Sequence, residues 1–99
     1  MSLEDFFVSD EPIKKTVEEE RRLRIRLSIF AYAYEFMDTS LISDSEFDKM
    51  CLEVDLSIDT GNKKLDDFFK KEFNPSTGMW IRNHPEQLRL SEIYRRYYV

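Results

Sequence analysis

The side chains best suited to catalysis in this chain are a single histidine, His84, and a single cysteine, Cys51. A cysteine and a histidine can act together as nucleophile and base, but only when the thiol is accessible and its pKa is lowered. Cys51 falls in an apolar stripe, which predicts a small buried hydrophobe in a reducing compartment. One histidine and one cysteine also offer no recognisable metal-ligand spacing. We therefore expect no catalytic residue and no metal site.

Phosphate-binding and nucleotidyl-transfer motifs are not recognisable either. The two glycines, Gly61 and Gly78, are isolated turn residues, so they form no glycine-rich phosphate loop. The sequence Lys-Leu-Asp-Asp at 64–67 comes close to the Lys-x-Asp-Gly motif of nucleotidyl transfer. It lacks the glycine and falls within a predicted helix, so we interpret it as a chance match. The prediction is that this protein is not an enzyme.

The first half of the chain has the pattern of two helices joined by a short connection. Thr16 and Glu19 have the spacing of a capping box, which predicts a helix that begins near Thr16. Apolar residues then recur every three or four positions, as on one helix face. They are Leu23, Leu27, Phe30, Tyr34 and Met37. Ser43 and Glu46 form a second capping box after residues 38–42, and such a short connection predicts a helical hairpin.

Two further helices are predicted in the second half. One spans residues 64–73 and has Lys70 and Lys71 near its negative end. The last begins at Asn83 or His84, because Pro85 suits a first helical turn. The inward apolar positions of these two helices are Leu65, Phe68, Phe69 and Phe73, followed by Leu90, Ile93, Tyr94 and Tyr97. The pattern does not define the conformation of residues 55–63 and 74–82.

Composition places these helices in one domain. A chain of 99 residues with 41% hydrophobic and 14% aromatic residues can bury one modest core. Two glycines and three prolines argue against an all-β chain with many tight turns. We predict an all-α, single-domain bundle of about four helices at residues 16–99, with a helical hairpin at its centre. We expect residues 1–15 to form an N-terminal arm that docks Phe6 and Phe7 on this body.

The net charge of −5 disfavours bulk electrostatic attraction to nucleic acid. The residues Arg21, Arg22, Arg24 and Arg26 nevertheless crowd one predicted helix. Two interpretations remain open: a solvated face paired with the acidic residues 18–20, or a strip that contacts nucleic acid. No apolar run is long enough to cross a membrane, and no leader pattern occurs at the N-terminus. A cytoplasmic location is therefore expected.

A longer motif spans the predicted hairpin. Tyr-Glu-Phe-Met-Asp at 34–38, followed by Ile-Ser-Asp-Ser-Glu-Phe-Asp at 42–48, resembles the small N-terminal helical subdomain of bacterial NAD-dependent DNA ligases. The family pattern reads Tyr-His, a loop, then Ile-Ser-Asp-x-Glu-Tyr-Asp. The similarity covers residues 23–54, and no ligase counterpart follows. The whole chain also resembles short stand-alone phage proteins that are described as ligase-related.

The resemblance implies a nicotinamide nucleotide ligand, because the ligase subdomain grips the nicotinamide mononucleotide (NMN) half of NAD. Tyr34, Asp44 and Asp48 keep the family's residues at their positions. Glu35 stands in place of histidine and brings a negative charge, and Phe47 stands in place of tyrosine and lacks its hydroxyl. These same residues also have purely structural interpretations: Asp44 as first-turn helix chemistry, Phe47 as core, Tyr34 as part of an apolar face.

Aromatic and arginine residues near the C-terminus suggest a surface for a protein partner. Trp80, Arg82 and Tyr98 are of the types enriched at interface hot spots, and Arg22 and Arg26 extend the set. Our leading hypothesis is a non-catalytic, phage-encoded interaction protein that modulates or inhibits a host, replication or defence protein. The alternatives are a module that binds NMN or NAD, and an accessory nucleic-acid-binding protein.

Overall fold

The computed structural model describes residues 15–98, and within them the chain forms four α-helices and one 3₁₀ helix. In chain order they are α1 (Val17–Phe36), α2 (Asp44–Leu52), α3 (Lys63–Glu72), η1 (Met79–Asn83) and α4 (Gln87–Tyr97). This part of the chain contains no β-strand. The predicted all-α class is confirmed. The expectation that Phe6 and Phe7 dock on the body lies outside the described residues.

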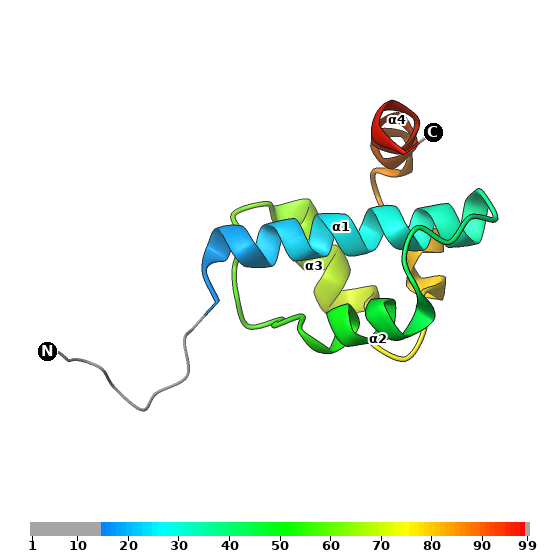
Figure 1. The fold of residues 1–99 in the computed structure, drawn as a ribbon. Helices are drawn as coiled ribbons and strands as arrows, with labels where there is room; N and C mark the ends of the chain where they lie inside the picture. Colours follow the sequence, from blue (N-terminus) through cyan, green and yellow to red (C-terminus); the bar gives the residue numbers. More distant parts are fainter. Residues whose placement is uncertain (1–14, 99) are drawn as a thin grey trace, which may run out of the picture.

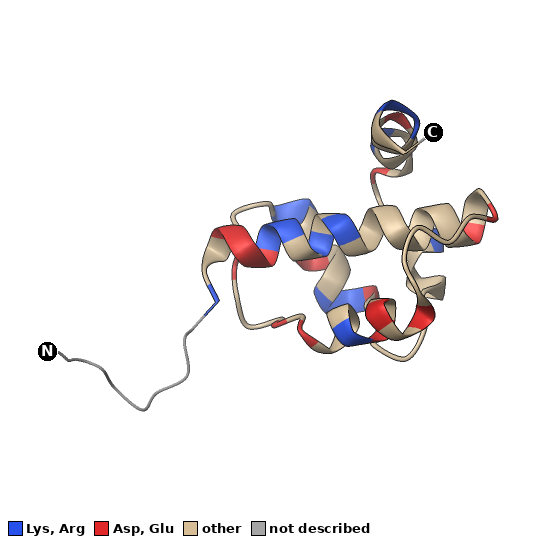
Figure 2. Cartoon of the chain, viewed as in Figure 1, with Lys and Arg blue, Asp and Glu red and all other residues tan. Residues whose placement is uncertain are grey.

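The helix α1 is the central element (Figure 1). It contacts α2, η1 and α4, and Figure 1 shows α2 returning along it while α4 crosses it steeply. The charges of α1 are concentrated in its first half, whereas its second half up to Tyr34 is uncharged (Figure 2). An uncharged helical stretch can be covered on several sides at low desolvation cost. This explains why α1 occupies the middle of the bundle.

Both predicted capping boxes are formed. The Thr16 hydroxyl accepts the Glu19 N–H at 3.1 Å, while the Glu19 carboxylate accepts the Thr16 N–H at 2.8 Å. Ser43 and Glu46 repeat this exchange at 3.1 and 3.2 Å. Each box satisfies donors that a helix start would otherwise leave unpaired. The starts of α1 and α2 therefore follow from local sequence.

The turn after α1 uses a residue in the left-handed region. Asp38 has a φ of 52°, a conformation that aspartate tolerates better than most side chains. The Thr39 N–H then donates to the Ala33 carbonyl at 3.0 Å, which satisfies one of the last carbonyls of the helix. The chain reverses here and leads into α2.

The core is aromatic and is centred on α3 and η1. The Trp80 ring packs against Phe68, Phe69 and Phe73, with centroid distances of 6.0, 5.3 and 5.3 Å. Trp80 is only 4% exposed, so the expectation that it marks a partner surface is wrong. The short 3₁₀ helix at residues 79–83 turns the Trp80 ring inward. The apolar segment at residues 79–81 is too short for its sequence to predict that orientation.

The last helix differs from its prediction at both ends. α4 begins at Gln87 rather than at residue 83 or 84, because residues 79–83 already form η1. Tyr97, expected to face inward, is 69% exposed. Tyr98, which follows the helix, instead makes an edge-on contact with Phe30 on α1 at 6.4 Å.

A buried ion-pair network fixes the segment between α2 and α3. The Arg24 side chain is fully buried and contacts Glu20 at 2.6 Å and Asp66 at 2.8 Å. It also donates to the carbonyls of Asp55 and Ile58. Charges inside a protein are tolerated only when they are paired and hydrogen-bonded in this way. Arg24 therefore holds residues 55–58 against α1 and α3.

This network corrects the picture of a continuous arginine strip on α1. Arg24 is buried, and Arg21 is half-buried with its guanidinium on the Thr60 carbonyl. Arg22 and Arg26 are exposed, and Arg22 pairs with Glu18 at 3.3 Å as the solvated interpretation expects. Two of the four arginines thus serve the interior rather than a nucleic-acid surface. No helix within residues 15–98 is both long and apolar enough to span a membrane.

Candidate functional site

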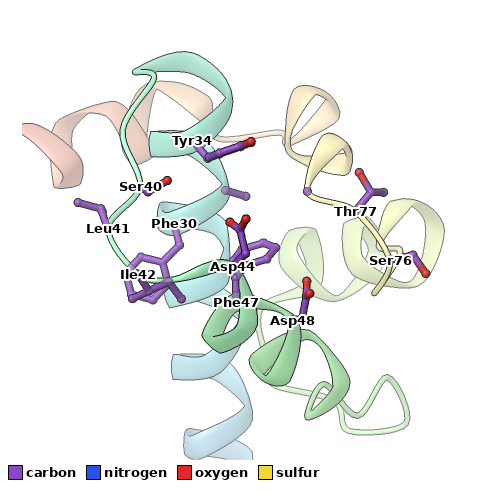
Figure 3. Close-up of a pocket in the computed structure, with 12 residues that line it drawn as sticks. Phe30, Tyr34, Ser40, Leu41, Ile42, Asp44, Phe47, Asp48, Ser76 and Thr77 are labelled. Carbon is purple, nitrogen blue, oxygen red and sulfur yellow. The ribbon is translucent and has the colours of Figure 1, made fainter.

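A cavity of about 290 Å³ lies at the corner where α1 leads into α2. Four of the five side chains suggested by the ligase resemblance line it: Tyr34, Asp44, Phe47 and Asp48 (Figure 3). The remaining lining residues are Phe30, Ala31, Ser40, Leu41, Ile42, Ser76, Thr77 and Gly78. We call this space the corner cavity.

Local helix geometry places the two carboxylates of the corner cavity side by side. Asp44 is the first residue of α2 and Asp48 lies four positions later, so both fall on one face of the helix. The capping box at Ser43 fixes where that helix begins and hence where the two aspartates point. In Figure 3 the carboxylates of Asp44 and Asp48 rise from α2 toward the space beside Tyr34 and Thr77.

The opposite wall comes from the distant segment at residues 76–78. A Cβ atom placed on Gly78 would lie 3.6 Å from the Phe47 ring and 3.9 Å from the Ala31 Cβ. Gly78 therefore faces both helices of the hairpin, with room for no more than a small side chain between them. This wall adds the hydroxyl groups of Ser76 and Thr77 to the lining. The resemblance to the ligase subdomain ends at residue 54, so the sequence did not predict that residues 76–78 line the cavity. The turn composition after residue 73 predicts a loop there but not where that loop packs.

The corner cavity combines an aromatic interior with an acidic rim. Phe30 and Phe47 offer ring surfaces, and Tyr34 is 59% exposed at the edge of the space. In the part of the chain that the structure describes, the only charged lining residues are Asp44 and Asp48, and none is Lys, Arg or His. Aromatic walls bind planar rings, and carboxylates accept hydrogen bonds from hydroxyl or amide groups. The lining suits a small ring-bearing ligand with several donors.

Glu35, the fifth residue suggested by the resemblance, does not line the corner cavity. A step of one residue turns a helix by about 100°, so Glu35 points away from the direction of Tyr34. Its carboxylate instead accepts Nε and Nη2 of Arg82, at 3.1 and 3.0 Å. Arg82 therefore reduces the electrostatic repulsion that the negative charge of Glu35 would exert on a bound phosphate.

The residues expected to form a partner surface are not brought together. Trp80 is in the core, and Arg82 is tied to Glu35 near the end of α1, although it remains 60% exposed. Arg22 pairs with Glu18 in the first turns of the same helix, about 20 Å away at 1.5 Å per residue. Arg26 lies over the Phe30 ring at 5.6 Å.

A different exposed surface, which sequence analysis assigned in part to the core, lies between α1 and α4. Tyr32 contacts Phe36 at 5.3 Å and Tyr94 at 6.1 Å, forming an aromatic row across the two helices. Phe36 and its neighbour Met37 are exposed at one end of that row. Tyr97 and Tyr98 are exposed at the end of α4. We call these four exposed residues, which lie on either side of the contact between Tyr32 and Tyr94, the α1/α4 aromatic surface.

Neither Cys51 nor His84 has the features of an activated catalytic group. Burial raises the pKa of the Cys51 thiol to about 11, and Asp48 contributes in the same direction. The thiol thus remains protonated near neutral pH. Burial also lowers the pKa of His84, whose Nδ1 accepts the Glu86 N–H at 3.0 Å. Within residues 15–98, no three metal-ligating side chains are grouped closely enough to hold a metal ion.

Comparisons with models of known protein families, with curated proteins and with solved structures found no match to this chain.

Proposed function

We propose that this protein is a non-catalytic binding module whose corner cavity holds a nicotinamide-bearing ligand. The observation that supports this proposal is the convergence of Tyr34, Asp44, Phe47 and Asp48 on one cavity. These residues were selected from a motif, whereas the cavity follows from the geometry of the fold alone. A retained ligand site of the ligase type would produce this agreement between the residues of the motif and the residues that line the cavity.

The lining supplies the contacts that such a ligand needs. The nicotinamide ring is planar and packs against the aromatic side chains of Phe30, Tyr34 and Phe47. The ribose hydroxyls donate to the carboxylates of Asp44 and Asp48, which are charge-assisted acceptors. Ser76 and Thr77 offer further hydroxyl groups from the opposite wall. A cavity of about 290 Å³ fits a nucleoside-sized ligand rather than a whole dinucleotide.

Calorimetric titration of the full chain with nicotinamide riboside, NMN and NAD tests the proposal. We expect binding to one site per chain by at least one of these ligands. Asp48→Asn keeps the shape of the side chain but removes its charge, and should weaken that binding about tenfold, since charged acceptors contribute about 1.5–3 kcal/mol. Glu92→Gln, an exposed substitution on α4 outside the lining, is the matched control and should bind like the parent.

Three results would contradict the proposal. If none of the three ligands binds while the circular dichroism spectrum still shows a helical fold, the proposed ligand site does not exist. If chromatography shows that the purified chain consumes NAD, the proposal that the protein is non-catalytic is wrong. Loss of binding in the Glu92→Gln control would place the ligand elsewhere on the protein.

A second candidate function is protein interaction through the α1/α4 aromatic surface. Exposed aromatic side chains and methionine are enriched where proteins meet. Phe36, Met37, Tyr97 and Tyr98 supply both types. The partner would be a host, replication or defence protein that this chain modulates, as the similarity to phage proteins implies.

Affinity capture from the natural host, compared among variants, tests the second candidate. A true partner should bind the parent chain and Asp48→Asn equally but should be lost in Phe36→Ser and in Tyr97→Ser. Both substituted residues are exposed, so the fold should persist. A partner that binds Phe36→Ser and Tyr97→Ser as well as it binds the parent chain would argue against this surface.

A further inference from the structure

We propose that the corner cavity selects a cationic ring without a phosphate, such as a pyridinium nucleoside, and discriminates against the corresponding nucleotide. This inference rests on the proposed ligand-binding function and names the class of ligand. Its starting observation is the charge of the lining, which among residues 15–98 consists of two carboxylates, from Asp44 and Asp48, without any basic side chain. A phosphate held beside them would meet like charge, whereas a pyridinium ring would meet opposite charge.

The nearby cations do not reverse this balance. Arg82 is the basic residue closest in sequence to the 76–78 wall, and its guanidinium is bound to Glu35 by contacts of 3.0 and 3.1 Å. Lys49 follows Asp48 on α2, but one residue along a helix is a rotation of about 100°, and Lys49 is absent from the lining. Arg26 lies over the ring of the lining residue Phe30, 5.6 Å from its centroid, but is not itself part of the lining. None of these three cations lines the cavity, whereas both carboxylates do.

The N-terminus of α2 is already partly occupied by the protein's own side chains, which weakens it as an anion site. Helix starts bind anions through unpaired N–H groups and the positive end of the helix dipole. Here the Glu46 N–H donates to Ser43 Oγ and the Ser43 N–H donates to the Glu46 carboxylate. Asp44 and Glu46 place two negative charges in the first turn, where Figure 2 shows the acidic start of α2. The protein's own carboxylates already satisfy this dipole.

The aromatic lining adds an attraction that is specific to cations. The faces of Tyr34 and Phe47 carry partial negative charge, which stabilises a cation placed over them, whereas the Phe30 ring already has the Arg26 guanidinium over it. A neutral ring of the same shape would keep the packing contacts but lose this term and the attraction to the aspartates. Two effects therefore determine which ligand binds: the positive charge of the ring strengthens binding, and the negative charge of a phosphate weakens it.

Calorimetry with matched ligands measures both effects. Nicotinamide riboside and NMN differ by one phosphate, and we expect the riboside to bind at least tenfold more tightly, equivalent to about 1.4 kcal/mol. Dihydronicotinamide riboside lacks the ring charge and should bind more weakly than the oxidised riboside. Raising the salt concentration should narrow the preference for the riboside over NMN, because exposed charges are screened.

Variants assign the preference to the two carboxylates. In Asp44→Asn combined with Asp48→Asn, the riboside should lose more affinity than NMN, because NMN is relieved of the like-charge repulsion, so that the ratio of their affinities approaches one. Glu92→Gln should leave the ratio unchanged. Both aspartates are exposed, so the double variant should fold.

The outcomes separate this inference from the function on which it rests. NMN binding as tightly as the riboside or more tightly would overturn the selectivity and leave the ligand site standing. No binding by any of the three ligands would overturn both. A preference for the riboside that survives the double variant would also overturn the inference, because its cause would lie outside Asp44 and Asp48.

Discussion

Arg24 and Asp66 are separated by 42 positions in the chain, yet Nη1 of Arg24 lies 2.8 Å from Oδ1 of Asp66 inside the protein. Asp66 also accepts the N–H and the hydroxyl of Thr60, and Glu20 accepts Arg24 Nε. One guanidinium thereby links α1, α3 and the segment between α2 and α3.

Replacing Arg24 should severely destabilise the fold. Arg24→Met fills similar space but leaves the buried carboxylate of Asp66 without its cation and Glu20 with only Lys15, and breaking a buried ion pair typically costs about 3–5 kcal/mol. Chemical denaturation followed by circular dichroism measures the free energy of unfolding. Arg22→Met, on the exposed face of the same helix, is the control and should change it by less than about 0.5 kcal/mol. Similar small losses in both variants would contradict the buried network.

The capping box of α2 should connect fold stability to ligand binding. Ser43→Ala removes the acceptor for the Glu46 N–H and should lower the free energy of unfolding by about 1 kcal/mol. Thr16→Ala removes the equivalent cap of α1 and should cost a similar amount. Only Ser43→Ala should also weaken binding in calorimetry, because Ser43 directly precedes Asp44. Equal binding by the two variants would show that the cap does not position the carboxylate.

His84 should make stability fall as the pH is lowered below about 6.5, its usual pKa. Burial lowers the pKa of His84 in the folded protein and outweighs the opposing effect of Glu86, so the unfolded chain takes up a proton that the folded chain does not. Stability is then lost as pH falls through the interval between the two pKa values. Unfolding free energies between pH 5 and 7 should show a shallower slope in His84→Gln. An unchanged slope would assign the pH dependence to other groups.

The indole of Trp80 should contribute through packing rather than through a hydrogen bond. Its Nε1 is buried and has no hydrogen-bond partner among the described residues. Trp80→Ala should cost about 3–5 kcal/mol by opening a cavity in the aromatic core. Trp80→Phe keeps a ring against Phe69 and removes an unpaired donor, so its cost should be less than half as large. Equal losses in the two denaturation experiments would indicate that Nε1 has a partner, such as a buried water molecule.

Much of the first half of the fold could be predicted from sequence because its signals are local. Thr16 with Glu19 and Ser43 with Glu46 lie within single helical turns, so a capping box is readable without knowledge of the rest of the chain. The same holds for the burial of Cys51, which follows from its place in an apolar stripe. Asp44 and Asp48 are also related locally, by the helical spacing of four.

Tertiary structure alone decided the features that join distant segments. The partners of Arg24 lie in α3 and in the segment before it, so its position among exposed arginines gave no sign that it is buried. The wall of the corner cavity at residues 76–78 and the inward rotation of Trp80 depend on packing against other helices.

The sequence by itself thus determined where α1 and α2 begin and that Asp44 and Asp48 share one helix face, because backbone hydrogen bonding and helical periodicity act over a few residues. That these two aspartates belong to a ligand site was suggested only by the resemblance to the ligase subdomain. Tertiary structure decided what closes the cavity, which charges are buried and which aromatic side chains remain exposed. These properties depend on which surfaces meet when the whole chain packs, and that is a non-local free-energy balance.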